Sequence, residues 1–309
     1  MFAWVAWSIW QQIQQQPELG LQLKNIWLSA SGAGMWKLLL VFLLMFVNWG
    51  LEARKWQVMM KNLTNLSFNQ SVKSILSGIA FSMNTPNRVG EYGGRVLFIE
   101  PEKRIRAVSL TAASSFSQLL ITMVMGSAGL YFIADNISAS PGVNSFRLGV
   151  TVLQSVVIAS TLLGFIMYFN MGSMIRVVER VPLINKVTSH FHVLVEMDKR
   201  TLFRSLTFSL IRFSVFIIQY NLMLQVMDVQ LGWWQGFWTV SVLFLLLAVI
   251  PTIALLELGL RWEFSVLLFG LFSNNSVGMY AAATGIWFIN LVVPAIAGSF
   301  FMLGWRRSV

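Results

Sequence analysis

Residues 36–52 read WKLLLVFLLMFVNWGLE, a run that is almost entirely apolar between Leu38 and Val47. A helix of this length extends about 26 Å at 1.5 Å per residue, which nearly matches the ~30 Å hydrocarbon core of a bilayer. The sequence therefore predicts a membrane-spanning helix here. Four more long apolar spans follow it, at 105–134, 147–170, 201–227 and 277–305.

The overall composition supports a membrane protein of the all-α class, with several helices that cross the bilayer. Hydrophobic residues make up 56% of the chain and charged residues 11%, and the mean hydropathy is +0.69. A water-soluble domain of this length would carry more charge. We interpret residues 1–309 as a single membrane domain, a polytopic transmembrane helical bundle.

Cysteine and histidine usage limits the chemistry that the chain can carry. There are no cysteines, which excludes disulfides and thiolate metal sites, and the two histidines are His190 and His192, in a polar stretch. This is too little for a metal cluster. We predict no metal site and no cofactor.

The net charge of +10 is explained by membrane topology. Lys and Arg gather in short segments between spans, whereas the loops 135–146 and 228–235 each carry one Asp. The positive-inside rule then places the basic segments, and the C-terminal Arg306-Arg307, on the cytoplasmic side of an inner membrane. A nucleic-acid partner is not expected, because no basic run is interleaved with aromatic residues. The basic segments are 53–73, 103–106 and 171–204.

The opening residues 1–13 have no basic segment before their apolar run and no clear cleavage site, so they read as part of a membrane helix. Such a helix would reach only about 20 Å, short of a full span. We expect the natural chain to begin further upstream.

Two further segments predict broken hairpins. Segment 71–100 begins and ends near basic, cytoplasmic residues and is interrupted at Thr85-Pro86, so it must enter the membrane and return. Segment 235–273 begins outside, breaks at Pro251 and returns. The alternative for both is an amphipathic helix lying on the membrane surface, which Asn84, Asn87 and Arg88 would suit.

The two hairpins suggest an internal duplication. One constant offset along the chain carries the span 36–52 onto 202–218 and Glu91 onto Glu257, and the matched elements cross the bilayer in opposite directions. We therefore predict two inverted-topology repeats, residues 1–134 and 147–305, each with one re-entrant hairpin. Carriers with a central site between broken helices share this plan.

The hairpins also share a charge pattern, E-x-G-x-R, beside their prolines. A carboxylate and a guanidinium at i and i+4 lie on one face of a helix. Charged groups in a membrane are costly and are functional candidates by default, although a purely structural ion pair is the alternative. The two copies are Glu91-Tyr92-Gly93-Gly94-Arg95 and Glu257-Leu258-Gly259-Leu260-Arg261.

In the first hairpin, Thr85 suits an N-cap and Pro86 a first helical residue, so a new helix start would attract anions. Arg88 and Arg95 add bidentate donors suited to a phosphate. A headgroup or another backbone could approach closely at three glycines, because they lack side chains. These glycines are Gly90, Gly93 and Gly94.

Arg212 lies inside the span 201–227, where it could partner Glu91 or Glu257 or extend its charged end to the cytoplasmic side. On the span that follows the first hairpin, polar residues form one stripe. The stripe could line a polar path or could serve ordinary helix packing. It consists of Thr111, Ser115, Gln118 and Thr122.

The stretch 84–95, Asn-Thr-Pro-Asn-Arg-Val-Gly-Glu-Tyr-Gly-Gly-Arg, resembles a signature of the lysylphosphatidylglycerol synthase transmembrane-region family of flippase-like membrane proteins. Residues 48–56, NWGLEARKW, are similar to the second span of that family. In a second motif Pro251 and Glu257 fit, but residues 252–256 lack the glycines that the family pattern has there. The positions that match the first motif are Pro86, Arg88, Gly90 and Glu91.

This resemblance implies a lipid translocator of the stand-alone kind, without a soluble synthase domain. It would move an anionic, aminoacylated or polyprenyl-linked lipid between leaflets, with Arg88 and Arg95 on the lipid phosphate and Glu91 and Glu257 as counter-charge or gate. No phosphate-cradling loop for ATP is present, so direct ATP drive is not expected.

Two alternatives of other classes stay open. One is a membrane enzyme acting on a lipid headgroup with Glu91 as general base, although no paired-Asp metal site or Ser-His pair accompanies it. The other is a non-catalytic partner of a soluble glycosyltransferase or synthase. We expect transport rather than catalysis and assign no catalytic residue.

Overall fold

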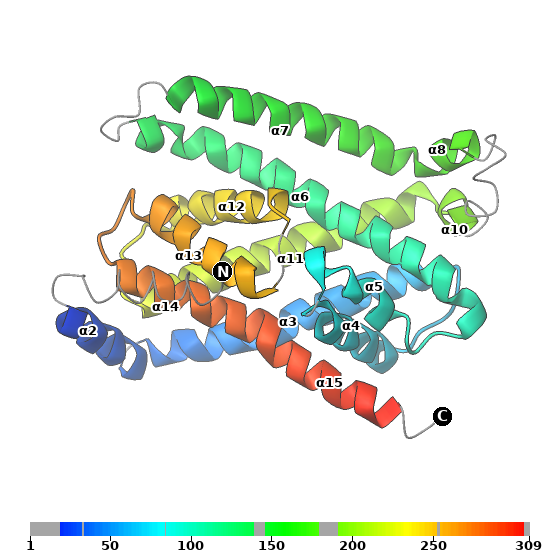
Figure 1. Ribbon diagram of the computed structural model, residues 1–309, viewed down its shortest axis with the longest axis horizontal. Coiled ribbons are helices and arrows are strands. Elements are labelled where there is room, and N and C mark those ends of the chain that lie inside the picture. The colour runs from blue at the N-terminus through cyan, green and yellow to red at the C-terminus, as the bar shows by residue number, and fades with distance from the viewer. Residues whose placement is uncertain are drawn as a thin grey trace. The chain divides into compact units, whose positions relative to one another are not determined.

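The computed structural model describes residues 19–32, 34–83, 85–138, 146–178, 191–251 and 254–305. Every regular element in these ranges is a helix (Figure 1), so the predicted all-α class is confirmed for the described part of the chain. The expected helix over residues 1–13 lies outside the described residues, as do Asn84, His190 and Arg306-Arg307.

Five helices are long and apolar enough to cross a membrane, which confirms the five predicted spans and defines a multi-pass membrane protein. Their apolar stretches are Met35–Met60, Pro101–Ala134, Gly149–Phe169, Lys199–Val226 and Ser276–Gly304. The helices that form the first four are α3 (Met35–Met60), α6 (Arg104–Ser138), α7 (Phe146–Phe169) and α11 (Lys199–Val226).

The fifth stretch contains α14 (Ser276–Trp287), a π-helical segment (Phe288–Val292) and α15 (Val293–Trp305). Asn290 lies in the π-helical segment and donates to the Gln219 side chain at 2.9 Å, and Gln219 donates to the carbonyl of Val41 at 2.9 Å. A local π turn widens the helix by one residue. The segment therefore coincides with a polar link between helices in an otherwise apolar region.

The chain divides into two compact units. Unit 1 holds residues 1–46, 124–157 and 215–292, and unit 2 holds residues 47–123, 158–214 and 293–309. Each unit draws on both predicted repeats, so this division does not test the inverted repeats, which stay a prediction.

In unit 2, α4 (Phe68–Ser82) packs against α5 (Gly90–Arg95) and against α15. Glycines make both approaches possible, because a Cβ on Gly94 would lie 2.5 Å from the Ser77 carbonyl oxygen and one on Gly298 would lie 2.0 Å from that of Leu76. Such distances are shorter than any side chain tolerates. Close backbone packing therefore fixes α5 beside α4.

An apolar core in unit 2 joins α3, α4, α6 and the segment that follows α5. It is centred on the fully buried Trp56 of α3 and includes residues of the short helix α10 (His192–Val195), which packs against α8 (Met171–Val178). Close packing of these side chains stabilises the unit and fixes the rotation of α3. Its other members include Met59, Met60, Ile75, Val96, Ile99, Ala107, Leu110 and Leu194.

In unit 1, α12 (Trp233–Val249) and α13 (Ala254–Phe269) pack against each other, and α13 packs against α14. Ile250 is extended, with φ −94° and ψ 113°, directly before Pro251. Proline disfavours the helical conformation in the residue that precedes it. The predicted break at Pro251 is confirmed, while entry of this hairpin into the membrane stays a prediction.

Candidate functional site

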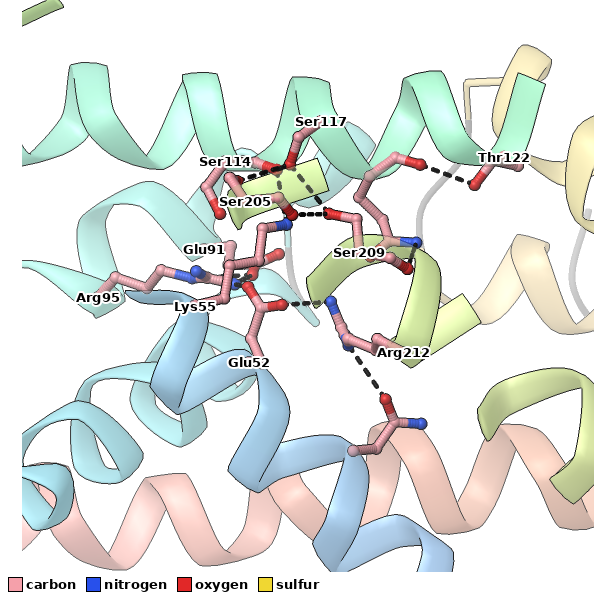
Figure 2. Close-up of polar contacts among 12 residues, drawn as sticks. Glu52, Lys55, Glu91, Arg95, Ser114, Ser117, Thr122, Ser205, Ser209 and Arg212 are labelled. Carbon is pink, nitrogen blue, oxygen red and sulfur yellow. Dashed lines mark hydrogen bonds and ion pairs between the residues drawn. The ribbon is translucent and has the colours of Figure 1, made fainter. Parts of the chain in front are cut away.

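The centre of the candidate site in unit 2 is Glu52, a buried carboxylate on α3 (Figure 2). Its Oε1 accepts a hydrogen bond from Nη2 of Arg95 at 2.6 Å, and its Oε2 accepts from Nη1 of Arg212 at 2.5 Å. One carboxylate therefore joins two guanidinium groups that come from α5 and α11. Charge-assisted bonds of this kind are the strongest that side chains form.

Arg95 lies between two carboxylates. Its Nε donates to Oε1 of Glu91 at 3.0 Å, and its Nη2 donates both to that oxygen and to Oε1 of Glu52. The guanidinium also lies 5.6 Å from the centre of the Trp56 ring, a cation–π distance. Only 3% of the Arg95 side chain is exposed, against 22% for Glu91. Arg95 is thus the buried member of the predicted pair, and Glu91 is its outer member.

Arg212 pairs with a carboxylate that the sequence analysis did not select. Its Nε donates to Oδ1 of Asn48 at 3.1 Å, and its Nη1 donates to Glu52. Asn48 and Glu52 lie one turn apart on α3, so one helix face supplies both acceptors. Glu52 is an additional partner, because our predictions for Arg212 were Glu91, Glu257 or extension to the cytoplasmic side.

Lys55 completes the cluster from the next turn of α3. Its side chain is 1% exposed, and its Nζ donates to the carbonyl oxygen of Ser114 at 2.8 Å. The hydroxyl of Ser117 donates to the same carbonyl at 2.7 Å and lies 2.9 Å and 3.0 Å from the hydroxyls of Ser205 and Ser209. These contacts connect α3, α6 and α11 through polar groups.

We call Glu52, Lys55, Glu91, Arg95 and Arg212 the charged cluster. It holds three cations and two carboxylates, so it carries one excess positive charge when every group is ionised. Removing such groups from water is costly, and ion pairs offset this cost only in part. A buried cluster without charge balance is therefore a candidate binding site.

The predicted break before α5 is present, but it is built differently from our expectation. Thr85 and Pro86 occupy the cap and first positions of a single 3₁₀ turn, Pro86–Arg88, and Arg88 is exposed with φ 57°. The Thr85 hydroxyl accepts from the N–H of Gly90 at 2.8 Å. A turn of this length has no appreciable dipole, so the anion-attracting helix start is not formed there.

Two of the three glycines of this hairpin lie against another backbone segment, and the third does not. A Cβ on Gly90 would lie 2.4 Å from the Phe81 carbonyl oxygen, and one on Gly94 would meet Ser77, so both permit close backbone approach as predicted. A Cβ on Gly93 would find no atom within 4 Å. Helical structure after the break also ends at Arg95, earlier than a full return arm would need.

The second copy of the pattern, in unit 1, forms its own pair on α13. Arg261 donates to Oε1 of Glu257 at 2.7 Å, both side chains are buried, and the guanidinium lies 6.0 Å from the centre of the Phe244 ring. Gly259, between them, is buried as well. The predicted i to i+4 pairing is therefore confirmed in both copies.

The polar stripe on α6 serves mostly helix packing. Thr111 and Thr122 donate to carbonyls one turn back, at 2.9 Å and 3.0 Å, and only the Gln118 amide reaches α11, at 3.5 Å from the Ser209 carbonyl. Ser117, which the stripe did not include, carries the shorter contacts to α11. The spacing of Ser205 and Ser209 at i and i+4 was the signal that could have found them.

Within the described ranges, no group of three or more His, Cys, Asp or Glu side chains could hold a metal ion. The chain matches no family model, and no curated protein matches it. Fold and site together define a multi-pass helical membrane protein with a buried cluster of charged side chains in unit 2.

Proposed function

We propose that this protein is a lipid translocator of the cytoplasmic membrane, which moves an anionic, aminoacylated or polyprenyl-linked lipid between leaflets. The observation that carries the proposal is the Glu52 bridge between Arg95 and Arg212, at 2.6 and 2.5 Å. Glu52 and Arg212 belong to helices long and apolar enough to span a bilayer. Ionisable groups in such helices are candidates for a functional site by default, because they are costly in a bilayer.

The lipid phosphate would bind by exchange with a carboxylate. Glu91 occupies two donors of Arg95 and is itself partly exposed, so an arriving phosphate competes with Glu91 for the same guanidinium. Arg88, on the exposed turn before α5, would give the phosphate its first cationic contact. Glu52 would keep Arg95 in place during this exchange, because it is a separate, buried acceptor of the same guanidinium.

The finer architecture belongs to the same proposal. The two hairpins would be re-entrant and related as inverted repeats, with Glu257 and Arg261 as the second charged pair and the C-terminus in the cytoplasm. The break at Pro251 and the packing of α12 on α13 support the second hairpin. The resemblance to flippase-like membrane proteins supports the lipid as substrate, and a soluble synthase or glycosyltransferase could act beside it.

Translocation can be measured directly in liposomes that contain the purified full chain and a headgroup-labelled phosphatidylglycerol, whose inner-leaflet label is protected from a membrane-impermeant quencher. We expect wild type to abolish this protection. Arg95→Ala and Arg212→Gln should slow the loss by about tenfold or more, because each removes a charge-assisted bond. Arg106→Gln, an exposed residue near the start of α6, is the matched control and should match wild type.

The comparison with empty liposomes decides the proposal. If wild type protects its inner-leaflet label as well as empty liposomes do, or if the cluster variants flip lipid at the wild-type rate, the proposal is wrong. Each variant is first checked for an unchanged elution profile and helix content. This step separates loss of transport from loss of fold.

A further inference from the structure

The charged cluster can lose its excess positive charge if one of its three cations releases a proton. Arg95 and Arg212 keep their protons in proteins, whereas a lysine can release its proton. Lys55 is therefore the one cation of the charged cluster that can become neutral.

The surroundings of Lys55 suit a group that changes its charge. Among the described residues, its ammonium hydrogen bonds only to the Ser114 carbonyl and has no carboxylate within 4.0 Å. Charged groups face it from three elements, while α6 presents the neutral carbonyl. They are Glu52 on its own helix, Glu91 and Arg95 on α5, and Arg212 on α11.

A second observation indicates that the cluster accepts an anion. Nη1 of Arg95 is fully buried and has no hydrogen-bond acceptor in the described part of the chain, although the other two nitrogens of this guanidinium are bonded. The amide nitrogen of Asn48 is likewise buried without an acceptor. Buried donors of this kind are costly unless something accepts from them. Arg95 itself binds Glu52, and Asn48 accepts a hydrogen bond from Arg212, which also binds Glu52.

We propose that the charged cluster binds one singly charged anionic group, such as a phosphodiester, through Arg95, and that Lys55 takes up a proton when it does so. With Lys55 neutral, the cluster has two cations and two carboxylates and is balanced. With Lys55 protonated and the anion bound, it is balanced again. The proton comes from the aqueous phase and binds to the lone pair of Nζ, so each anion enters together with one proton.

This inference deepens the proposed function, because it gives lipid binding a dependence on pH that translocation would share. It concerns binding alone, and so it can fail or stand separately from transport. Couplings between two linked sites are typically about 5-fold to 150-fold in affinity. Anion affinity should fall by about that factor as Lys55 loses its proton with rising pH.

The test uses the full chain in detergent, titrated calorimetrically with short-chain phosphatidylglycerol in buffers of different ionisation enthalpy. Repeating this from about pH 5 to about pH 11 covers the range over which buried and exposed lysines lose protons. Inorganic phosphate and short-chain phosphatidylcholine are parallel probes. Binding of phosphatidylglycerol alone identifies an anionic lipid, and binding of inorganic phosphate identifies a general anion site.

We expect wild type to take up close to one proton per phosphatidylglycerol bound near the pH at which Lys55 titrates. Lys55→Arg, with a fixed charge, should bind without proton uptake, and Lys55→Met should lose about 5-fold to 150-fold in affinity. The exposed Lys61→Met should behave as wild type. Proton uptake that persists in Lys55→Arg, or the absence of binding by any anionic probe, would overturn the inference.

The results also separate this inference from the proposed function. Proton-linked binding without flipping in liposomes supports the anion site and contradicts the proposal that the protein is a lipid translocator. Flipping without proton uptake on binding contradicts the proposed role of Lys55 and supports the proposal that the protein is a lipid translocator.

Discussion

The Glu52 carboxylate and the Arg95 guanidinium meet at 2.6 Å, although the two residues lie 43 positions apart in the chain. The contact ties α5, a helix of six residues, to α3, a helix of 26. A helix as short as α5 has little stability of its own. Its position depends on this bond and on the close packing of Gly94 against α4.

Replacing Glu52 should destabilise the protein strongly. Glu52→Gln removes the charge that two buried guanidinium groups share, and breaking a buried ion pair typically costs about 3–5 kcal/mol. Thermal or denaturant unfolding in detergent, followed by circular dichroism, measures the loss. Glu100→Gln is the control, because Glu100 pairs with Lys103 on the surface, where such pairs contribute about 0–1 kcal/mol. Equal losses in both variants would contradict the central role of Glu52.

Neighbouring glycines should respond in opposite ways to alanine. Gly94→Ala would place a methyl group 2.5 Å from the Ser77 carbonyl oxygen, so α4 and α5 must separate, at a cost of about 1–3 kcal/mol. Gly93→Ala meets no atom within 4 Å and should be neutral or stabilising by about 0.4–1 kcal/mol. Unfolding midpoints of the two variants and wild type check this. Should Gly93→Ala be the more damaging change, the packing of α5 described above is wrong.

The second charged pair should show direct energetic coupling. We expect Glu257→Gln and Arg261→Gln to be non-additive, with an interaction energy of about 0.5–3 kcal/mol, because the side chains are buried and 2.7 Å apart. A double-mutant cycle on unfolding free energies measures it. The exposed pair Glu100 and Lys103 serves as the comparison and should show an interaction energy of about 0–1 kcal/mol. Additive effects at Glu257 and Arg261 would show that their bond contributes nothing.

The start of α11 should weaken in acid. Asp198 accepts hydrogen bonds from the Thr201 hydroxyl and from the Thr201 N–H, the latter at 2.8 Å, and these bonds hold the pKa of this carboxyl below its usual value. A lowered pKa in the folded state gives stabilisation that is present above the unfolded value, about 3.9, and is lost as the pH falls through the folded value. The protection of amides in the first turn of α11 against hydrogen exchange, taken relative to the unfolded-chain rate at each pH, should therefore fall below about pH 4. Asp198→Asn keeps the cap and should remove this pH dependence.

The local features of the fold followed from sequence. The five spans, the breaks at Pro86 and Pro251 and the two i to i+4 ion pairs depend on residues that are near in the chain, and helix geometry alone places such residues together. The same logic misjudged the segment after Pro86, where a single 3₁₀ turn stands in place of a new helix. Local signals for a cap and a proline do not fix the length of the helix that follows.

Tertiary structure alone decided which charges meet. Asn48, Glu52 and Lys55 lie at i, i+4 and i+7 on one face of α3, a pattern visible in the sequence, but only the rotation of α3 about its axis brings that face to Arg95 and Arg212. That rotation depends on Trp56 in the apolar core and on glycines that let α5 approach α4. Such packing sums many small contacts between distant residues, and no local pattern encodes it.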